Sequence, residues 1–470
     1  MKIVIVSHYF ETHPGGLEII AGGLMRALVR LGHRVVWLAC DATAPPADTG
    51  GIAVALPASN VLEDRLSLPI PIPTPAAAAR IFRQVRRADA VLVHDTLYPT
   101  SVLAFLAARL WRKPCIIAAH VGLVPYRSRL LRLAMAIANR LIARPLLAHA
   151  DRVAFVSEIT LAYFATVRFR APPAVIFNGV DTDVFRTAAD YAARAALRTR
   201  LDLPPDRAVA LFVGRFVEKK GLHLLQRMAQ RRPDILWALA GWGLIDPNAW
   251  GLKNVRVFSG LSGASLAPLY QASDVFVLPS VGEGYPLVIQ EALACGLPVV
   301  CGDETARADP AAQAFLTPVA MNFDDPDAIA TDFCAAIDGL LADSGDREAT
   351  AAARSRFAAE RYSWDACANK YAALIEAARN TKPKSSPRRS TPFAEIPSIK
   401  AEIPSTEIAS TRPPATNNLA TPDIGGETTF VARNPLAEGE RIQREKHGIE
   451  EPYPPEICFA AAPPAAAISE

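Results

Sequence analysis

Apolar runs of four to seven residues alternate with stretches of helical periodicity over the first half of the chain. The residues from Leu17 to Leu31 have a helical apolar period and stop at Gly32, a suitable helix cap. Continuous apolar strands separated by helices predict a parallel sheet covered on both faces. The predicted strands are Lys2–Val6, Arg34–Ala39, Ala90–His94, Cys115–Ala119, Arg152–Val156 and Val175–Phe177.

The second half repeats this alternation and predicts a second α/β domain. Its predicted strands are Val209–Val213, Ile235–Ala240, Val255–Phe258, Val275–Leu278 and Pro298–Val300. Its predicted helices are Gly221–Ala229, Leu266–Ala272, Leu287–Ala294 and Asp327–Leu341.

The hinge between the two domains is predicted within Arg186–Pro205, just before the second sheet begins. We expect domains at residues 1–185 and 186–362, and then a closing helix at residues 363–380. From Thr381 onward Pro, Ser, Thr, Ala and charged residues dominate. Such a composition cannot bury enough apolar surface to order itself, so residues 381–470 are predicted to be a disordered tail.

Composition narrows the function classes. The chain has 470 residues, half of them apolar, and a formal net charge of +3, which argues against a general nucleic-acid binder. Seven scattered cysteines without C-x-x-C pairing fit a reducing compartment. The apolar run at the N-terminus is too short for a signal peptide, and the segment Leu130–Leu147 carries three arginines. We therefore expect a cytoplasmic protein.

Ligands of open parallel sheets sit beyond the carboxyl ends of the strands. After Val209–Val213 the chain places Arg215 and Lys220 in a loop that leads into a helix, where two cations suit a pyrophosphate. The same residues would also fit an ordinary solvated basic turn. After the next strand come Gly241 and Gly243, whose spacing is equally consistent with a simple strand-to-helix turn.

Two glutamates follow the strand Val275–Leu278. Glu283 lies in the loop and Glu291 two helical turns later, which separates them by roughly 10–12 Å at 1.5 Å per residue. That span is too long for an acid–base pair on one bond, but it matches a nucleoside diphosphate sugar. The alternative is a pair of acids that interact with the helix dipole.

In this order the motifs resemble the retaining glycosyltransferases of family four, also called group 1, which have the GT-B fold of two Rossmann-like parallel-sheet domains facing across a cleft. The resemblance covers roughly residues 1–378 and excludes the tail. It rests on Gly-Arg-x4-Lys-Gly, Gly-x-Gly, the segment Ser273–Ser280 and Glu-x7-Glu, together with Asn178–Asp181, Gly296–Val299 and Tyr362–Trp364.

The resemblance implies a role for each matched residue. Arg215 and Lys220 would bind the donor pyrophosphate, Glu283 the sugar hydroxyls and Glu291 the ribose. Backbone and apolar donor contacts would involve Gly15, Gly16, Gly241, Gly243, Tyr285, Pro286 and Leu287. His120, after the strand Cys115–Ala119, matches the histidine that faces the donor sugar. We interpret His94, by contrast, as a structural strand-end histidine.

The implied reaction is transfer with retention of the anomeric configuration and without a required cofactor or metal. The sequence has no Asp-x-Asp motif or histidine cluster that suggests a catalytic cation. Arg215 and Lys220 could neutralise the departing diphosphate instead. One departure from the family is the segment Cys301–Ala306, which replaces a Gly-Gly-x-Pro-Glu loop and leaves the donor identity open.

A stretch rich in basic residues in the first half of the chain suggests where the acceptor binds. Between Arg65 and Arg144 there are thirteen basic residues and two acidic ones, and Tyr126–Leu147 mixes arginines with apolar positions. A basic amphipathic helix can lie on an anionic membrane, here the inner face of the cell membrane. An ordinary covering helix with a solvated arginine face fits as well. In the resembling family the acceptor is a glycan or lipid-linked sugar, as in polysaccharide biosynthesis.

Two other function classes remain open at this stage. A nucleotide-sugar epimerase can share the two-domain architecture, but it would consume donor without an acceptor. A catalytically silent binding protein of the same fold would bind the donor without consuming it. The pair of Glu283 and Glu291 with Arg215 and Lys220 favours transfer over both.

Overall fold

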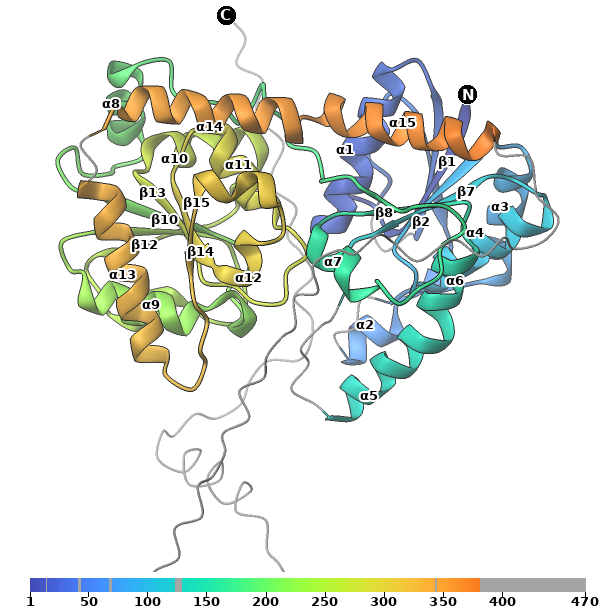
Figure 1. Cartoon of the computed structure of the whole chain (residues 1–470), viewed down its shortest axis with the longest axis horizontal. Coiled ribbons are helices and arrows are strands. Elements are labelled where there is room, and N and C mark those ends of the chain that lie inside the picture. The colour runs from blue at the N-terminus through green and yellow to red at the C-terminus, as the bar shows by residue number, and fades with distance from the viewer. Residues whose placement is uncertain (14, 41–43, 67–69, 123–128, 343–344, 381–470) are drawn as a thin grey trace, which may run out of the picture. The chain divides into compact units, whose positions relative to one another are not determined.

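The computed structural model describes residues 1–380, except residues 14, 41–43, 67–69, 123–128 and 343–344. The predicted tail at residues 381–470 therefore lies outside the described residues, as do Pro14, Tyr126 and Arg127. The described part contains two parallel sheets, each covered by helices, as the alternating pattern predicts (Figure 1).

The first sheet has the strand order β3-β2-β1-β6-β7-β8-β9, with every pair parallel. Its strands are β1 (Lys2–Tyr9), β2 (Arg34–Cys40), β3 (Ile52–Leu56), β6 (Ala90–His94), β7 (Cys115–Ala119), β8 (Arg152–Phe155) and β9 (Ala174–Val175). The short strands β4 (Ala58–Ser59) and β5 (Ile72–Pro73) form a separate antiparallel pair.

Helices connect the strands of this first half. They are α1 (Gly16–Arg30), α2 (Val61–Leu66), α3 (Pro75–Arg86), α4 (Pro99–Leu110), α5 (Arg129–Ala138), the π-helical turn η1 (Asn139–Ala143), α6 (Arg144–His149) and α7 (Glu158–Tyr163). The central strands β1, β6 and β7 are almost fully buried, because helices pack on both faces. Their continuous apolar sequences reflect this burial.

The second sheet has the order β12-β11-β10-β13-β14-β15, and again all of its pairs are parallel. Its strands are β10 (Val209–Val213), β11 (Leu236–Ala240), β12 (Val255–Phe258), β13 (Val275–Leu278), β14 (Val299–Gly302) and β15 (Leu316–Val319). In both sheets the chain runs outward from a central strand, returns, and continues on the other side. This is the Rossmann-like order, with switch points between β1 and β6 and between β10 and β13.

The helices of the second half are α8 (Tyr191–Arg200), α9 (Leu222–Arg231), α10 (Ala267–Ala272), α11 (Leu287–Ala294), α12 (Asp303–Ala306), α13 (Pro326–Ala342), α14 (Arg347–Tyr362) and α15 (Trp364–Asn380). Short 3₁₀ turns lie at η2 (Glu218–Lys220), η3 (Pro247–Trp250), η4 (Gly263–Ser265) and η5 (Pro310–Phe315). The segment expected to be a hinge contains α8, and the long helix α14 was not among the predicted elements.

Helix α15 lies alongside α1 and packs on the first sheet (Figure 1). Its residues Cys367, Tyr371 and Ile375 are buried in one cluster with β1 and α1. The ring of Trp364 occupies the space that side chains at Gly23 and Gly179 would need, since a Cβ at either glycine would lie 2.1 Å from it. The closing helix thus completes the core of the first half.

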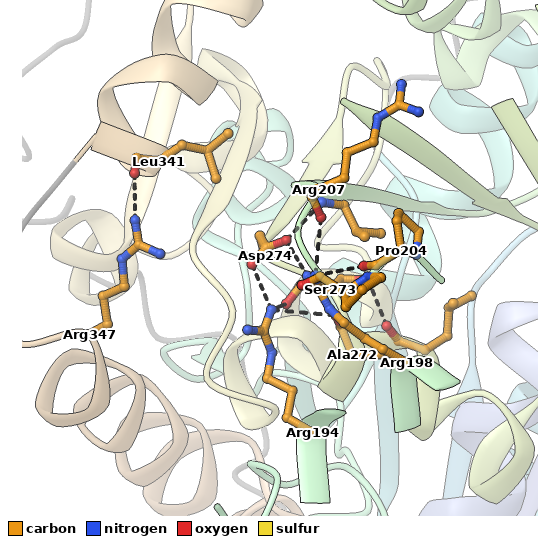
Figure 2. Close-up of polar contacts among 12 residues, drawn as sticks. Arg194, Arg198, Pro204, Arg207, Ala272, Ser273, Asp274, Leu341 and Arg347 are labelled. Atoms are coloured by element: carbon orange, nitrogen blue, oxygen red, sulfur yellow. Dashed lines mark hydrogen bonds and ion pairs between the residues drawn. The ribbon is translucent and has the colours of Figure 1, made fainter. Parts of the chain in front are cut away.

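An ion cluster fixes α8 to the amino ends of the second sheet (Figure 2). Asp274, just before β13, accepts hydrogen bonds from Arg194 at 2.6 Å, from Arg198 at 2.5 Å and from the N–H of Val209 at 2.7 Å. Arg198 also donates to four backbone carbonyls, those of Ala272, Pro204, Pro205 and Arg207. Burying these charges is tolerated because each of them is paired and hydrogen-bonded.

Candidate functional site

The candidate residues gather at the carboxyl ends of the strands beside the two switch points. In the first half they follow β1, β6 and β7, and in the second half they follow β10, β11 and β13. Loops diverge at these points, so the sheet leaves room for a ligand there.

Lys220 and Glu283 come together from the loops after β10 and β13. The Nζ atom of Lys220 lies 3.0 Å from Oε1 of Glu283, and both side chains are mostly buried. Burial lowers the pKa of Lys220, and the neighbouring Glu283 carboxylate partly offsets that effect. The two sequence motifs therefore form one charged pair.

Gly221 allows this approach. Its φ is 75°, and a Cβ there would lie 2.3 Å from the carbonyl oxygen of Pro279. A hydrogen bond of 3.1 Å from the N–H of Val281 to the carbonyl of Lys219 joins the same two loops. Only glycine combines this backbone conformation with such close contact.

Two further cations lie near the pair. Lys219, which sequence reasoning did not single out, has its Nζ 3.5 Å from Oε1 of Glu283. Arg215 is exposed and has no ion-pair partner among the described residues. The positive charge at this strand end therefore exceeds what Glu283 balances, as a phosphate site requires.

The glycines after β11 serve the packing of loops. A Cβ at Gly241 would lie 1.9 Å from the carbonyl oxygen of Gly214, and one at Gly243 would lie 2.4 Å from that of Phe216. The N–H of Phe216 also donates to the carbonyl of Trp242 at 2.7 Å. The backbone of the Gly-x-Gly segment thus packs directly against the backbone of the loop that carries Arg215.

Glu291 lies on α11 and receives a hydrogen bond of 2.8 Å from the hydroxyl of Tyr270. Burial raises the pKa of Glu291 to about 7, although the bond from Tyr270 acts in the opposite direction. Sequence spacing placed both glutamates correctly on loop and helix. It did not indicate the tyrosine partner.

Tyr285, Pro286 and Leu287 form the start of α11. The hydroxyl of Tyr285 lies 3.1 Å from that of Tyr362, which in turn donates to Asp309 at 2.5 Å. Tyr285 is buried in the core of the second sheet. The side chain of Tyr285 is therefore committed to the fold.

The start of α1 carries a carboxylate that the sequence analysis did not identify. Gly15 precedes the helix, and a Cβ there would lie 2.1 Å from Oε2 of Glu18, whereas one at Gly16 would meet nothing within 4 Å. The buried Glu18 lies 2.9 Å from Nε2 of His8. Burial would raise the pKa of Glu18, but hydrogen bonds from His13 and His8 hold it at about 2.

His120 follows β7 and contacts both halves of the described chain. Its Nε2 lies 2.9 Å from Nδ1 of His94, and its N–H donates to Asp95 at 2.9 Å. A Cβ at Gly284 would lie 2.7 Å from the carbonyl oxygen of His120, so the loop of Glu283 abuts this histidine. Burial lowers the pKa of His120 to about 3, which keeps the imidazole neutral.

The segment Cys301–Ala306 forms the end of β14 and the short helix α12. Cys301 and Gly302 are buried, and Glu304 is exposed. Asp303 pairs with Arg307 at 2.9 Å across one helical turn. Residues Asp303–Ala306 of this segment are thus helical.

Within the described ranges, no helix is both long and apolar enough to cross a bilayer. The same residues contain no group of three or more histidine, cysteine or acidic side chains arranged to hold a metal ion.

Comparison with known proteins gives the family. The model of the family described as Glycosyltransferase Family 4 matches residues 14–184, and that of Glycosyl transferases group 1 matches residues 193–381. A D-inositol 3-phosphate glycosyltransferase of Xylanimonas cellulosilytica is 34% identical over 212 residues, which are 41% of this chain and 48% of that protein. The match thus spans about half of the length of this curated relative.

Solved structures resemble the chain over most of its length. HepE of Anabaena, in complex with UDP and glucose, has a TM-score of 0.59 at 19% identity and covers 80% of this chain and 99% of its own. Sucrose-phosphate synthase of Thermosynechococcus elongatus has a TM-score of 0.60 at 20% identity, with coverage of 80% and 98%. At this identity the likeness concerns the fold, which is GT-B. With both halves matched in order, the chain belongs to glycosyltransferase family 4.

Proposed function

We propose that this protein transfers a sugar from a nucleoside diphosphate sugar to an acceptor, with retention of the anomeric configuration and without a metal ion. The observation that carries the proposal is the convergence of Lys220, Glu283 and His120. Lys220 lies 3.0 Å from Glu283, and the neighbouring Gly284 abuts the backbone of His120. The loop that carries the charged pair thus abuts the main chain of His120.

Each group has a chemical task in this proposal. Lys220 and the exposed Arg215 stabilise the negative charge that develops on the departing diphosphate. Glu283 accepts hydrogen bonds from sugar hydroxyls, and His120, being neutral, hydrogen-bonds the same sugar. Glu291 holds the ribose hydroxyls, and the open backbone at Gly16 admits a phosphate at the start of α1.

A thermal-shift screen tests the donor site. UDP-, GDP-, ADP- and dTDP-sugars are added to wild type, Arg215→Ala and Glu291→Ala. Ligand at a hundredfold over its dissociation constant adds about 2.7 kcal/mol of apparent stability. We expect one nucleotide to stabilise wild type and neither variant. No shift with any nucleotide sugar would contradict the proposal, and donor consumption into an epimer without any acceptor would point to an epimerase.

We propose further that the acceptor is lipid-linked or a glycan, and that α5 meets it at an anionic membrane. Four apolar side chains on α5 and η1 are exposed, namely Leu130 (77%), Leu133 (59%), Ile137 (49%) and Leu141 (67%). Between Asp95 and Asp151 the sequence has eight basic residues and no acidic one. Arg132 and Arg140 on the same two elements are exposed as well, and exposed leucines beside arginines are typical of helices that lie in a lipid interface.

Sedimentation with vesicles tests this docking surface. We expect binding to vesicles with anionic lipid at low salt, weaker binding at high salt, and loss of binding in the double variant Leu130→Ser, Leu133→Ser. The matched control is Leu244→Ser, because Leu244 is 97% exposed but belongs to the second half. Equal binding of both variants would contradict the assignment to α5.

A further inference from the structure

Two histidines meet at the ends of neighbouring strands. His94 is the last residue of β6, and His120 directly follows β7, its parallel neighbour. The Nδ1 atom of His94 lies 2.9 Å from Nε2 of His120, and the two rings stack with centroids 5.1 Å apart. His94 is fully buried, and His120 is 8% exposed.

Both imidazoles of this pair are in the neutral form. Burial lowers the pKa of both imidazoles. Each ring is therefore neutral and carries one proton, shared between one donor and one acceptor nitrogen. In the bond between Nδ1 of His94 and Nε2 of His120, one ring donates and the other accepts.

The outer nitrogens are then coupled. If His94 donates, His120 carries its proton on Nδ1 and offers a donor there; if His120 donates, its Nδ1 is an acceptor. Nδ1 of His120 and Nε2 of His94 are both buried without a hydrogen-bond partner within the described part of the chain. The tautomers of the two rings are thus coupled, and when one outer nitrogen is a donor the other is an acceptor.

Asp95 fixes the main chain of His120. It has a φ of 59°, and its N–H donates to the carbonyl of Ala118 at 2.8 Å, while its Oδ1 accepts from the N–H of His120 at 2.9 Å. A non-glycine residue in this conformation is strained unless its surroundings hold it. His94 therefore contacts the ring of His120, and the next residue, Asp95, contacts its backbone.

We propose that His94 is a positioning residue, which holds the ring of His120 through the hydrogen bond between the two imidazoles and so orients this histidine for the donor sugar. This role rests on the proposed function. It reverses the sequence-based interpretation of His94 as a purely structural strand-end histidine.

Three substitutions of His94 separate the polar contact from the ring shape. His94→Asn keeps a polar atom at the position of Nδ1, His94→Gln moves it to that of Nε2, and His94→Phe keeps a ring without nitrogen. Ser101→Ala is the matched control, because Ser101 donates to the backbone carbonyl of His94 and leaves the ring untouched.

Binding of nucleoside diphosphates and of nucleotide sugars is compared, so that contacts to the sugar are distinguished from contacts to the nucleotide. Dissociation constants are measured for UDP against UDP-glucose, and for GDP against GDP-mannose, together with donor hydrolysis by the full chain. We expect His94→Phe and His94→Gln to bind the bare diphosphates as wild type does, to bind the nucleotide sugar about tenfold more weakly, and to hydrolyse it about a hundredfold more slowly. His94→Asn should recover most of both losses, and Ser101→Ala should match wild type.

The outcomes distinguish the two proposals. A wild-type chain that binds none of the UDP-, GDP-, ADP- and dTDP-sugars of the thermal-shift screen overturns the proposed function. If wild type binds and hydrolyses donor but His94→Phe does so equally well, only the positioning role falls. Equal loss of diphosphate and nucleotide-sugar binding in His94→Phe, or a His94→Asn variant as impaired as His94→Phe, would also overturn it.

Discussion

Charged side chains are fully paired at the amino ends of the second sheet and only partly paired at its carboxyl ends. At the amino ends, Asp274 accepts three hydrogen bonds, and Arg198 donates to it and to four carbonyls. At the carboxyl ends, Glu283 faces two lysines and Arg215 is exposed without an ion-pair partner among the described residues. The hydroxyl of Ser280 is buried there without a hydrogen bond in the same part of the chain.

This difference in pairing suggests that the amino ends contribute to stability and the carboxyl ends to ligand binding. A cluster in which every charge is paired has no free group for a ligand. Removal of one of its partners leaves the other charge buried and unpaired, which destabilises the fold. A cluster with excess positive charge and unpaired polar atoms is costly to the fold and useful only when a ligand completes it. Substitutions at the amino end should therefore change stability, and those at the carboxyl end should change binding and turnover.

The largest effect is expected at the amino end. Asp274→Ala leaves Arg198, whose side chain is 8% exposed, without its carboxylate. We expect the free energy of unfolding to fall by about 3–5 kcal/mol, measured by urea denaturation. Asp365→Ala is the control, since Asp365 pairs with Arg30 at 2.9 Å but is 68% exposed. A comparable loss in both variants would contradict the role given to burial.

Lys220→Met should show the opposite pattern. Without the cation, the departing diphosphate is less stabilised, and we expect turnover to fall by about 10²–10³-fold. The free energy of unfolding should fall by less than in Asp274→Ala, because Lys219 still faces Glu283 and burial already disfavours the charge of Lys220. Steady-state kinetics and denaturation of the same preparation check both statements.

Lys219→Met is the matched control for this prediction. Lys219 lies 3.5 Å from Glu283 and is more exposed than Lys220. We expect only a few-fold loss of turnover. If Lys219→Met were the more impaired of the two variants, the residue assigned to the diphosphate would be wrong.

Much of this arrangement could be predicted from the sequence. Strand ends are set by local apolar runs, so the loops of Arg215, Glu283 and His120 followed from pattern. Contacts across the fold did not: the pairing of His94 with His120 and of Tyr270 with Glu291 depends on strand order and packing. The carboxylate of Glu18 was missed because nothing in the local pattern of α1 indicates that His8 approaches it.

Helix α8 shows a second kind of limit. The segment was predicted to be a hinge because of Pro204 and Pro205, yet both prolines supply carbonyls to Arg198. The helix is weakly apolar, and its position is set by charge rather than by an apolar stripe. Hydrophobic periodicity does not detect an element that is held in this way.

Gly221→Ala tests the link between the two loops at the carboxyl end. The new Cβ would need a left-handed backbone and would lie 2.3 Å from the carbonyl of Pro279. We expect a loss of about 2–3 kcal/mol in the free energy of unfolding, together with weaker donor binding, because Lys220 is displaced from Glu283. Calorimetry and donor titration measure the two effects.

Gly251→Ala isolates the contribution of the backbone. Gly251 has a φ of 67°, but a Cβ there would meet nothing within 4 Å. We expect about 1 kcal/mol of destabilisation and unchanged donor binding. Equal effects at both glycines would mean that the contact with Pro279 is relieved without moving the loop.

Glu291→Gln gives the smallest effect, which depends on pH. The folded pKa of Glu291, raised to about 7, exceeds its ordinary value of 4.5. Between these values the folded protein holds a proton that the unfolded chain has released, so the free energy of unfolding falls as pH rises from 4.5 to 7. Because Glu291 is partly exposed, we expect about 1 kcal/mol across this window, and the glutamine variant should lose this dependence. Urea denaturation at pH 5 and pH 8, with the exposed Glu304→Gln as control, measures it. A wild-type slope in Glu291→Gln would show that another group causes the pH dependence.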